Sequence, residues 1–299
     1  MSIKHFLSLT DFSRGDLEQI IERAAELKRL HSSGVQHQPL DGKTMAMIFE
    51  LKSTRTRVAF EAGMHQLGGH AIFLRPDETQ LGRGEAIEDT ARVLSLMVDI
   101  IMLRVQDHAD ISSFTAASSV PVINGMSNRF HPCQLLADIQ TFAEKRGCIR
   151  DQSVAFIGDG YNMCNSYIVA SKQFDFDLTI STPTEFRPDE ALIDSSSRAR
   201  WVASPKEAVS GANLVVTDVW SSMGQEEERA NRLKAFQGFQ VNADLLDDAH
   251  PDVLFMHCLP AHRGEEISDD LLEDPRSVVW EEAGNRLHSQ KALLEFMLG

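Results

Sequence analysis

Residues 44–57 read Thr-Met-Ala-Met-Ile-Phe-Glu-Leu-Lys-Ser-Thr-Arg-Thr-Arg, an apolar run that passes directly into hydroxyl and guanidinium side chains. The run from Thr44 to Phe49 is typical of a buried strand, and the helical pattern that follows ends at a pair of glycines. Hydroxyls and N–H groups at the start of a helix bind phosphate, and two arginines add forked donors that match phosphate oxygens. We therefore predict a phosphate-binding strand–helix junction at Ser53–Arg57, with a simple hydroxyl cap and solvent-facing arginines as the alternative.

The alternation of a short apolar run with a helical pattern continues along the chain. Amphipathic segments such as 16–30 and 87–98 separate the runs. Eight further runs are predicted strands, at residues 71–74, 100–103, 120–123, 153–157, 178–180, 214–217, 253–256 and 278–280. Continuous apolar strands separated by helices indicate parallel sheets covered on both faces, so we predict an α/β fold with doubly wound parallel sheets.

The length of 299 residues suits two domains of about 150 residues each. A helix from about Pro132 to Glu144 is followed by a new strand at Ser153, which places the break near 145–148. We expect one domain at 1–146 and a second at 147–284, with a C-terminal helix at about 285–299 that packs back on the first domain.

Composition excludes several classes of protein. Apolar residues make up 42% of the chain and charged residues 24%, and the formal net charge is −15. A chain this acidic is unsuited to nucleic acid or anionic membranes, and an anionic ligand would need a local cluster of arginines. The four cysteines show no metal-binding spacing, and neither a secretory signal nor a membrane span is apparent. We expect a soluble, cytoplasmic protein with reduced thiols.

Polar residues follow six of the predicted strands. In open parallel sheets, ligands bind outside the carboxyl ends of the strands, so we expect these residues to meet in one cleft between the two domains. The segments are Ser53–Arg57, Arg104, Asn124 with His131–Gln134, Gly158–Asn162, Asp218 with Ser221–Gly224, and His257–Pro260.

Two of these segments have a structural alternative that the sequence leaves open. His131 and Gln134 open a helix and can orient a carbonyl oxygen, or they can be a capped helix start. Gly158-Asp159-Gly160 resembles a nucleotide-binding turn but lacks the third glycine of the dinucleotide fingerprint, and Asn162 can be a cap or an amino-acid ligand.

Two further segments belong to the second half of the chain. Asp218 can hold an ammonium group or cap a helix, and Gly224 offers a hinge for the loop after it. The segment His257–Gly264 can be a zinc site, a cysteine nucleophile or a substrate loop. Because His257 and Cys258 are adjacent and would point to opposite faces of an extended strand, we favour the substrate loop.

In this order, the segments resemble the aspartate/ornithine carbamoyltransferase family, and within it the ornithine branch, over almost the whole chain. The matching motifs are Ser53–Arg57, His131–Gln134, Asp218 with Ser222–Gly224, His257–Pro260 and Asn285-Arg286. Leu51 departs from the family pattern, which often has a lysine there. The resemblance implies that residues 1–146 bind carbamoyl phosphate, that residues 147–284 bind ornithine, and that the carbamoyl group is transferred to the ornithine δ-amine to give citrulline, for arginine biosynthesis.

The resemblance also implies roles for individual residues. The carbamoyl-phosphate set is Ser53, Thr54, Arg55, Thr56, Gln80, Arg104, His131, Pro132, Cys133, Gln134, Cys258, Leu259 and Arg286, with Gln80 reaching the site of a neighbouring subunit. The ornithine set is Asn162, Asp218, Ser222 and Met223. The catalytic set is Arg55, Arg104, His131 and Cys258.

The resemblance implies a homotrimer, or a multiple of one, and neither a metal nor an organic cofactor. Three alternatives stay open. One is a carbamoyltransferase for another acceptor, such as putrescine, acetylornithine or aspartate. The others are a nucleotide-dependent oxidoreductase, suggested by the doubly wound pattern and Gly158-Asp159-Gly160, and a non-catalytic protein of the same fold.

Overall fold

The computed structural model describes residues 4–221 and 229–299. The chain forms two compact units, one made of Met1–Gln140 with Gly284–Gly299 and the other of Thr141–Ala283. We call them unit one and unit two and describe each by itself. Two helices, α5 (Pro132–Arg146) and α11 (Val279–Leu298), contain residues of both units.

Unit one is built on a parallel sheet with the strand order β2-β1-β3-β4. Its strands are β1 (Thr44–Phe49), β2 (His70–Leu74), β3 (Ile100–Arg104) and β4 (Val122–Met126). The chain moves outward in one direction from β1 to β2 and then returns to add β3 on the other side of β1. The order therefore reverses between β1 and β3, which is the position where doubly wound sheets bind ligands.

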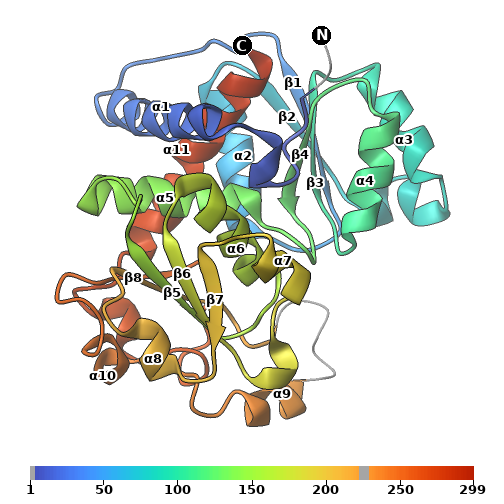
Figure 1. Cartoon of the computed structure of the whole chain (residues 1–299). Helices are drawn as coiled ribbons and strands as arrows, with labels where there is room; N and C mark the ends of the chain where they lie inside the picture. Colours follow the sequence, from blue (N-terminus) through green and yellow to red (C-terminus); the bar gives the residue numbers. More distant parts are fainter. Residues whose placement is uncertain (1–3, 222–228) are drawn as a thin grey trace. The chain divides into compact units, whose positions relative to one another are not determined.

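Both faces of this sheet are covered, which explains why its central strands are apolar throughout. The helices of unit one, besides α5 and α11, are α1 (Arg14–Ser32), α2 (Thr54–Gln66), α3 (Ile87–Ser95) and α4 (His108–Ala117), with short 3-10 turns at Leu9–Asp11, Pro76–Glu78 and Leu81–Arg83. Helices α3 and α4 lie on one side of the sheet, and α1, α2 and α11 lie on the other (Figure 1). On the first side, Ala91, Ile111 and Phe114 of the helices pack against Ile48 and Leu103 of the strands.

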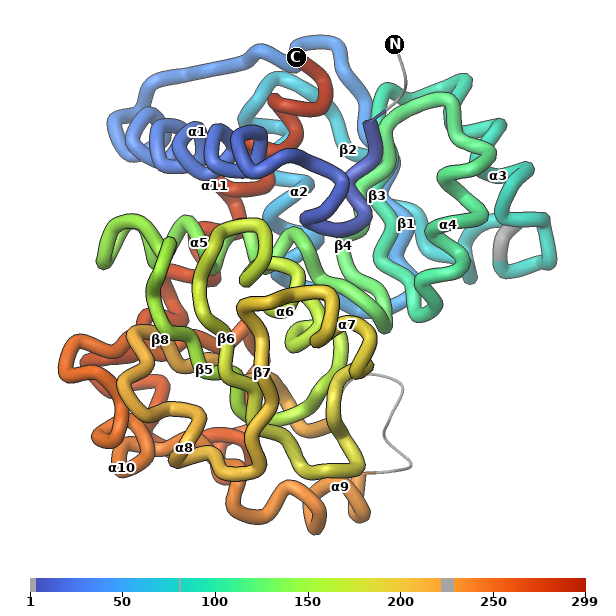
Figure 2. Tube along the Cα trace, viewed as in Figure 1, coloured from blue at the N-terminus to red at the C-terminus, as the bar shows by residue number. Residues whose placement is uncertain are grey.

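The last helix packs on α1 and α2 in unit one, as Figure 2 also shows. Arg23 of α1 forms an ion pair with Glu295 at 2.8 Å, and Lys291 donates to the side chain of Gln66 in α2 at 3.1 Å. A Cβ atom at Gly63 would lie only 3.2 Å from the Lys291 side chain, so the glycine lets α2 and α11 approach closely. Residues from the two ends of the chain thus stabilise the same unit.

Unit two contains a second parallel sheet with the order β7-β6-β5-β8-β9. Its strands are β5 (Ser153–Ile157), β6 (Asp177–Ser181), β7 (Ala199–Val202), β8 (Leu214–Thr217) and β9 (Leu254–His257). Its remaining helices are α6 (Asn162–Phe174), α7 (Glu190–Asp194), α8 (Pro205–Val209), α9 (Arg229–Ala235) and α10 (Ala243–Leu246), with 3-10 turns at Thr184–Phe186 and Leu271–Glu273. The order reverses between β5 and β8, which is the switch point of this sheet.

The core of unit two also lies on both faces of its sheet. On one face, Ile157, Val215 and Phe255 pack with apolar residues of α8, α10 and the loops around them. On the other face, the rings of Phe156 in β5 and Tyr167 in α6 lie 5.9 Å apart. The predicted fold class, two α/β units with parallel sheets, is confirmed.

One predicted element was wrong, and one strand was not predicted. Residues 278–280 do not form a strand, because only Ser277 makes an isolated bridge to Phe255 and α11 begins at Val279. Strand β7 was not predicted, because its sequence Ala-Arg-Trp-Val is short and is interrupted by an arginine. Such a sequence is compatible with its position at the edge of the sheet, where β7 pairs only with β6.

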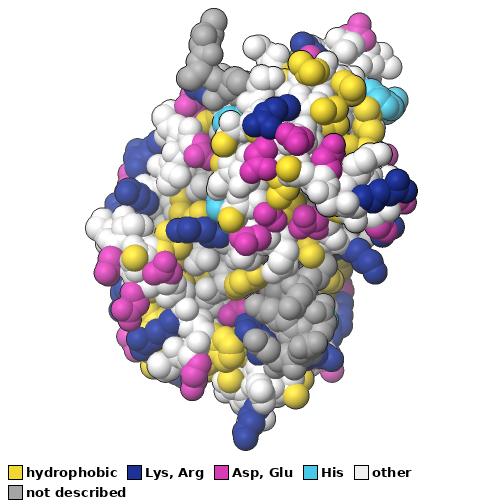
Figure 3. All heavy atoms as spheres, turned by 90° about the vertical axis from the view of Figure 1, so that its right-hand side faces the viewer, with side chains coloured by type: hydrophobic (Ala, Val, Ile, Leu, Met, Phe, Trp, Pro, Cys, Tyr) yellow, Lys and Arg dark blue, Asp and Glu magenta, His cyan; other side chains and the backbone are white. Residues whose placement is uncertain are grey.

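Figure 3 shows the side of the chain on which α3 and α4 lie in Figure 1, and hydrophobic side chains gather in its upper part. Just after α3, Leu96 is 84% exposed and Met97 is 71% exposed. Large apolar side chains grouped in this way are typical of surfaces that bind another protein. None of the helices in the described ranges combines the length and the apolar character needed to cross a bilayer.

Candidate active site

The switch point of unit one brings two of the predicted segments together. Phe49 at the end of β1 is the register partner of Arg104 at the end of β3, and the backbone N–H of Glu50 donates to the carbonyl of Arg104 at 2.9 Å. The loop after β1 leads into α2. The Ser53–Arg57 segment and Arg104 therefore lie at the same edge of the sheet.

Ser53 is the N-cap of α2. Its hydroxyl oxygen accepts a hydrogen bond from the backbone N–H of Thr56 at 3.2 Å. The capping role that the sequence left open for this hydroxyl is thus present in the structure. Because the positive end of the helix dipole remains at this position, the start of α2 is also suited to an anion.

A buried hydrogen-bond network connects three distant parts of unit one. Thr56 accepts from a guanidinium N–H of Arg104 at 3.4 Å and from one of Arg286 at 3.1 Å. Arg286 also donates to the side-chain carbonyl of Gln134 at 2.5 Å. Gln134 in turn donates to Asp138 at 2.9 Å. Two buried arginines are thereby fixed next to the start of α2, where phosphate oxygens would find several charged donors.

His131 lies beside these arginines and is 6% exposed. Burial lowers the pKa of His131 well below its ordinary value, and the charges of Arg286, Arg104 and Arg55 lower that pKa further. The imidazole is therefore neutral at physiological pH. A neutral imidazole can donate one hydrogen bond to a carbonyl oxygen without adding a further positive charge to the site.

Cys133 has a different environment from its neighbours in the motif. Its thiol is fully buried and lies 3.4 Å from the backbone carbonyl of Asn124, to which it donates. Burial raises the pKa of this thiol to about 12, so it stays protonated and unreactive. The thiol contact therefore holds the start of α5 to β4.

Three residues near the motif behave differently from the network. Arg57 forms an ion pair with Glu61 at 3.0 Å, and its guanidinium stacks on the ring of Phe73 at 3.7 Å. Thr54 is exposed at the start of α2. Gln80 lies in the loop between two 3-10 turns with an exposed side chain, which makes no hydrogen bond to the network within the described part of the chain.

The switch point of unit two positions Asn162 and Asp218. Ile157 at the end of β5 is the register partner of Thr217 at the end of β8, and the Thr217 hydroxyl donates to the Ile157 carbonyl at 2.6 Å. Asn162 opens α6 after β5 and is 4% exposed. Asp218 directly follows β8 and is buried. An amide and a carboxylate thus lie at the edge where a doubly wound sheet binds its ligand.

The carboxylate of Asp218 has weak partners for a buried anion. One of its oxygens accepts from the backbone N–H of Val219 at 2.8 Å and from the thiol of Cys258 at 3.2 Å. Burial raises the pKa of Asp218, although the His257 ring and these hydrogen bonds oppose the rise. A cation beside this carboxylate would offset the cost of its burial, because buried charges need a partner of opposite sign.

Unit two contains a buried ion pair that the sequence pattern did not indicate. Arg232 in α9 pairs with Asp159 and also donates to the backbone carbonyl of Trp220 at 2.5 Å. Its guanidinium lies 4.4 Å from the centre of the Phe186 ring. Arg232 fixes the loop after β5 to the segment after β8. Nothing in the sequence around Arg232 sets it apart from the exposed arginines of the chain, so only the tertiary contact identifies it.

The glycines of the segment 158–160 are explained by packing. A Cβ atom at Gly160 would lie within 2.4 Å of the backbone of Phe186 and Pro188. Gly158 has a φ of 130°, a conformation that other residues rarely adopt. The glycine pair therefore allows close approach of two chain segments, and a nucleotide is not needed to explain it.

The expectation that His257 and Cys258 point apart was wrong. Strand β9 ends at His257, so Cys258 lies outside the extended strand to which the alternation of side chains applies. Metal-ligating atoms of Asp218, His257 and Cys258 lie within 4.8 Å of one another. Both ring nitrogens of His257 are engaged, however, since Nδ1 accepts from the Leu259 N–H at 2.9 Å and Nε2 faces a carboxylate oxygen of Glu266 at 3.2 Å.

The remaining two candidates of the second half, Ser222 and Met223, lie outside the described residues. The same holds for Gly224, the predicted hinge. The described part of this loop ends at Ser221, shortly after Asp218.

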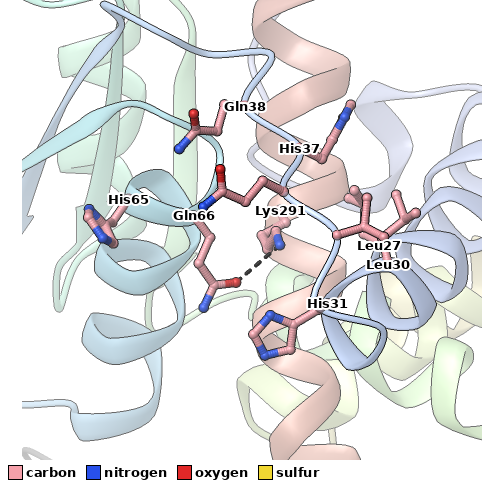
Figure 4. Close-up of a pocket in the computed structure, with 11 residues that line it drawn as sticks. Leu27, Leu30, His31, His37, Gln38, His65, Gln66 and Lys291 are labelled. Carbon is pink, nitrogen blue, oxygen red and sulfur yellow. Dashed lines mark hydrogen bonds between the residues drawn. The ribbon is translucent and has the colours of Figure 1, made fainter.

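Unit one also contains a pocket that the sequence did not suggest. It has a volume of about 310 Å³ and is lined by α1, the loop after it, α2 and α11. Figure 4 shows Lys291 at its centre, pointing toward Gln66, with His31, His37 and His65 around it. Lys291 is 4% exposed, and burial lowers its pKa, although Glu295 opposes this change. A lysine here is costly to charge, because its only hydrogen-bond partner in the described part of the chain is a neutral amide.

Comparisons with known proteins agree with this arrangement of two units. Residues 4–144 match the aspartate/ornithine carbamoyltransferase carbamoyl-P binding domain, and residues 150–297 match the Asp/Orn binding domain of the same family. The anabolic ornithine carbamoyltransferase of Pseudomonas aeruginosa is 58% identical over 299 residues, which cover 100% of this chain and 98% of the relative. An ornithine carbamoyltransferase of a Psychrobacter species is 56% identical with the same coverage.

Solved structures give the same result. The ornithine carbamoyltransferase of Burkholderia thailandensis superposes with a TM-score of 0.92 at 48% identity, over 99% of each chain. That of Pyrococcus furiosus has a TM-score of 0.93 at 47% identity, over 98% of this chain and 96% of the other. Full-length identity, both domain matches and the shared fold lead to one conclusion: this chain belongs to the aspartate/ornithine carbamoyltransferase family of enzymes.

Proposed function

We propose that this enzyme is an ornithine carbamoyltransferase, which transfers the carbamoyl group of carbamoyl phosphate to the δ-amine of L-ornithine and releases L-citrulline and phosphate. The observation that carries the proposal is the network of Thr56, Arg104, Arg286 and Gln134 beside a neutral His131. It combines donors for a phosphate with a donor for a carbonyl. The relatives named as ornithine carbamoyltransferases support the choice of acceptor.

Unit one supplies the carbamoyl-phosphate site in this proposal. The phosphate oxygens accept from the start of α2 and from the two buried arginines. Arg104 also contacts the carbonyl oxygen, together with His131. The full set that we assign to carbamoyl phosphate is Ser53, Thr54, Arg55, Thr56, Gln80, Arg104, His131, Pro132, Cys133, Gln134, Cys258, Leu259 and Arg286. The domain division that we propose is 1–146, with about 285–299, for this substrate and 147–284 for ornithine.

Unit two supplies the acceptor site. The buried Asp218 carboxylate pairs with the α-ammonium group of ornithine, which provides the cation that its burial calls for. Asn162, Ser222 and Met223 complete the contacts to the α-amino and α-carboxylate groups. An acceptor without a free α-ammonium group, such as putrescine or acetylornithine, leaves this carboxylate without a charged partner and binds more weakly.

The reaction proceeds in two steps. The neutral δ-amine attacks the carbamoyl carbon, a C–N bond forms, and the carbonyl oxygen becomes an oxyanion that Arg104 and His131 stabilise. The C–O bond to phosphate then breaks, and the departing phosphate accepts a proton from the nitrogen. One preorganised oxyanion donor is worth about 3 kcal/mol, so two donors supply a large part of the barrier reduction. Positioning of the two substrates supplies another part.

We further propose that the enzyme is a cytoplasmic homotrimer, or a multiple of one, that serves arginine biosynthesis. The exposed Leu96 and Met97 support contact with a second copy of the chain. The exposed Gln80 is available to reach a neighbouring site. All four cysteines are free, which suits a reducing compartment. The name of the Pseudomonas relative supports the anabolic direction.

An assay of the carbamoylated product, with carbamoyl phosphate and a panel of amines, tests the proposed reaction. Ornithine is expected to be carbamoylated, with a kcat/KM at least about 100-fold above those of putrescine, acetylornithine and aspartate, because only ornithine offers both the δ-amine and the α-ammonium group. A higher kcat/KM with any of the other three would contradict the proposed acceptor.

A further inference from the structure

Three buried, electron-rich atoms face one another in unit two, outside the set of residues assigned to the reaction. The Nδ1 atom of His262 lies 3.7 Å from Oε2 of Glu265 and 3.9 Å from Oε2 of Glu266. All three atoms are buried, and none has a hydrogen-bond partner within the described residues. Buried polar atoms are almost always hydrogen-bonded, so three that converge in one place require an explanation.

The other side-chain oxygens of the two carboxylates are fully engaged. Oε1 of Glu266 accepts from the backbone N–H of His262 at 2.5 Å and faces Nε2 of His257 at 3.2 Å. Oε1 of Glu265 accepts from the guanidinium of Arg229. Each carboxylate is therefore held in place by one oxygen and presents the other to the cluster. Glu266, whose side chain is 0% exposed, does so from a fully buried position.

A tight turn brings the three side chains together. The N–H of Glu265 donates to the carbonyl of His262 at 3.0 Å, and the N–H of Gly264 donates to the carbonyl of Ile267 at 2.8 Å. Gly264 has a φ of 84°, which favours glycine at this point of the turn. The arrangement is thus fixed by the backbone, and the side chains need no large movement to meet a ligand.

We propose that His262, Glu265 and Glu266 bind one divalent metal ion of the Mn²⁺ or Zn²⁺ class. One imidazole and two carboxylates are ligands that these ions accept. Metal–ligand distances of about 2.1 Å place neighbouring ligand atoms about 3.0 to 3.4 Å apart. The separations of 3.7 and 3.9 Å between His262 Nδ1 and the two carboxylate oxygens therefore need to shorten only slightly around an ion. With both carboxylates ionised and Arg229 charged, the cluster has a net charge of −1, which a divalent cation offsets.

The other cluster of possible metal ligands in unit two lacks a histidine nitrogen that is available to an ion. At Asp218, His257 and Cys258, both nitrogens of the histidine are already engaged. A metal ion at His262 would act on that region only indirectly, because Glu266 binds the ion through one oxygen and orients His257 through the other. The proposal therefore does not depend on the proposed reaction.

Titration of the purified full-length enzyme with Mn²⁺, followed by the loss of the electron paramagnetic resonance signal of the free ion, tests the site. Mn²⁺ is the probe because it prefers oxygen and nitrogen ligands to sulfur ligands such as Cys258. The wild-type enzyme is expected to bind one Mn²⁺ per chain. Glu265→Gln and His262→Ala are expected to weaken binding at least about tenfold, since each removes one of three ligands.

Two controls keep the result interpretable. Glu273→Gln removes a carboxylate that is 66% exposed and lies outside the cluster, so it should bind Mn²⁺ as the wild type does. Mn²⁺ should raise the melting temperature of the wild type and of Glu273→Gln but not of Glu265→Gln. Two results would overturn the proposal: no wild-type binding up to about 1 mM Mn²⁺, or equal binding by all four proteins.

Discussion

Arg286 and Gln134 are 152 residues apart in the chain, yet a guanidinium N–H of Arg286 donates to the Gln134 side-chain carbonyl at 2.5 Å. A second N–H of the same guanidinium reaches Thr56 at 3.1 Å. This forked contact joins the first helical turn after β1 to helices α5 and α11. It is the element of unit one on which the positions of the other donors depend.

Replacement of Arg286 by lysine should therefore be far from conservative. A lysine ammonium cannot reach Thr56 and Gln134 with the planar fork of a guanidinium, so at least one charge-assisted hydrogen bond is lost. We expect kcat/KM for carbamoyl phosphate to fall roughly 10- to 100-fold in Arg286→Lys. The matched control is Arg276→Lys in unit two, where the arginine pairs with Asp274 and Asp247. Equal kinetics of the two variants would contradict the prediction.

Replacement of Arg55 and replacement of Arg57, both at the start of α2, should have very different effects on carbamoyl transfer. Arg57 is occupied by Glu61 and the Phe73 ring, whereas Arg55 lowers the pKa of His131 from nearby. We expect Arg55→Ala to lose carbamoyl transfer by roughly 1,000-fold or more with the fold intact, and Arg57→Ala to stay within about fivefold of the wild type. Steady-state citrulline kinetics and circular dichroism check both variants. Near-normal turnover of Arg55→Ala would remove the phosphate assignment.

His131 should make the protein less stable in acid. Its pKa is lowered by burial in the folded state, so below about pH 6.5 the unfolded state binds one more proton than the folded state. Stability then falls as the pH drops, with a slope of up to about 1.4 kcal/mol per pH unit from this group.

Urea unfolding of the wild type and of His131→Gln at several pH values between 7.5 and 5 measures this contribution. The variant should lose less stability than the wild type over that interval, because it removes the group that titrates. His5 and His108, whose pKa values are also lowered by burial, remain in both proteins and cancel in the comparison. The same loss of stability in both proteins would show that folding does not lower the pKa of His131.

Lys291→Met should stabilise unit one at neutral pH. Burial lowers the pKa of Lys291, so the charged lysine opposes folding at every pH below its folded-state pKa. We expect a melting temperature higher by about 2 °C or more at pH 7, and the difference should shrink as the pH rises toward 10.5, the ordinary pKa of lysine. Lys234→Met, at an exposed position of α9, should change little. A lower melting temperature of Lys291→Met would mean that the hydrogen bond of the wild-type lysine to Gln66 outweighs the cost of burying the lysine.

Gln80 should contribute to the site of a neighbouring subunit, if the trimer that we propose forms. Gln80→Ala and Arg55→Ala should each be nearly inactive alone. After joint unfolding and refolding of the two variants, some mixed trimers contain a site with both native residues, so activity should reappear. Arg55→Ala refolded alone is the control, and the absence of any recovery in the mixture would place Gln80 in the site of its own chain.

Much of the fold follows from local sequence pattern. Strands β1, β3, β5 and β8 were predicted almost to the residue, because each is a largely apolar run that ends at a polar residue or a glycine. The pattern failed at residues 278–280, where three apolar residues open a helix instead. It also failed at β7, whose Arg200 and Trp201 lack the apolar continuity of a central strand.

The candidate site was predictable only in part. Arg104 and Asp218 were predictable as site residues, because each is a polar residue at the end of an apolar strand and a parallel sheet brings the carboxyl ends of its strands to one edge. The Arg232–Asp159 pair arises from tertiary contact between segments far apart in the chain. The alternation rule misplaced Cys258 relative to His257, because the rule holds only within an extended strand and β9 ends at His257.

Because most of α11 belongs to unit one, the order in which the ribosome synthesises the chain affects how that unit forms. The ribosome delivers Gln134 and then must add 152 more residues before Arg286 exists. At about 5 to 20 residues per second, that delay is roughly 8 to 30 s. During this time the nascent unit one has its sheet but lacks the guanidinium that ties Thr56 to Gln134. Unit two is encoded without interruption and can mature first, and a chain cut short before Arg286 would contain a first unit that never becomes competent.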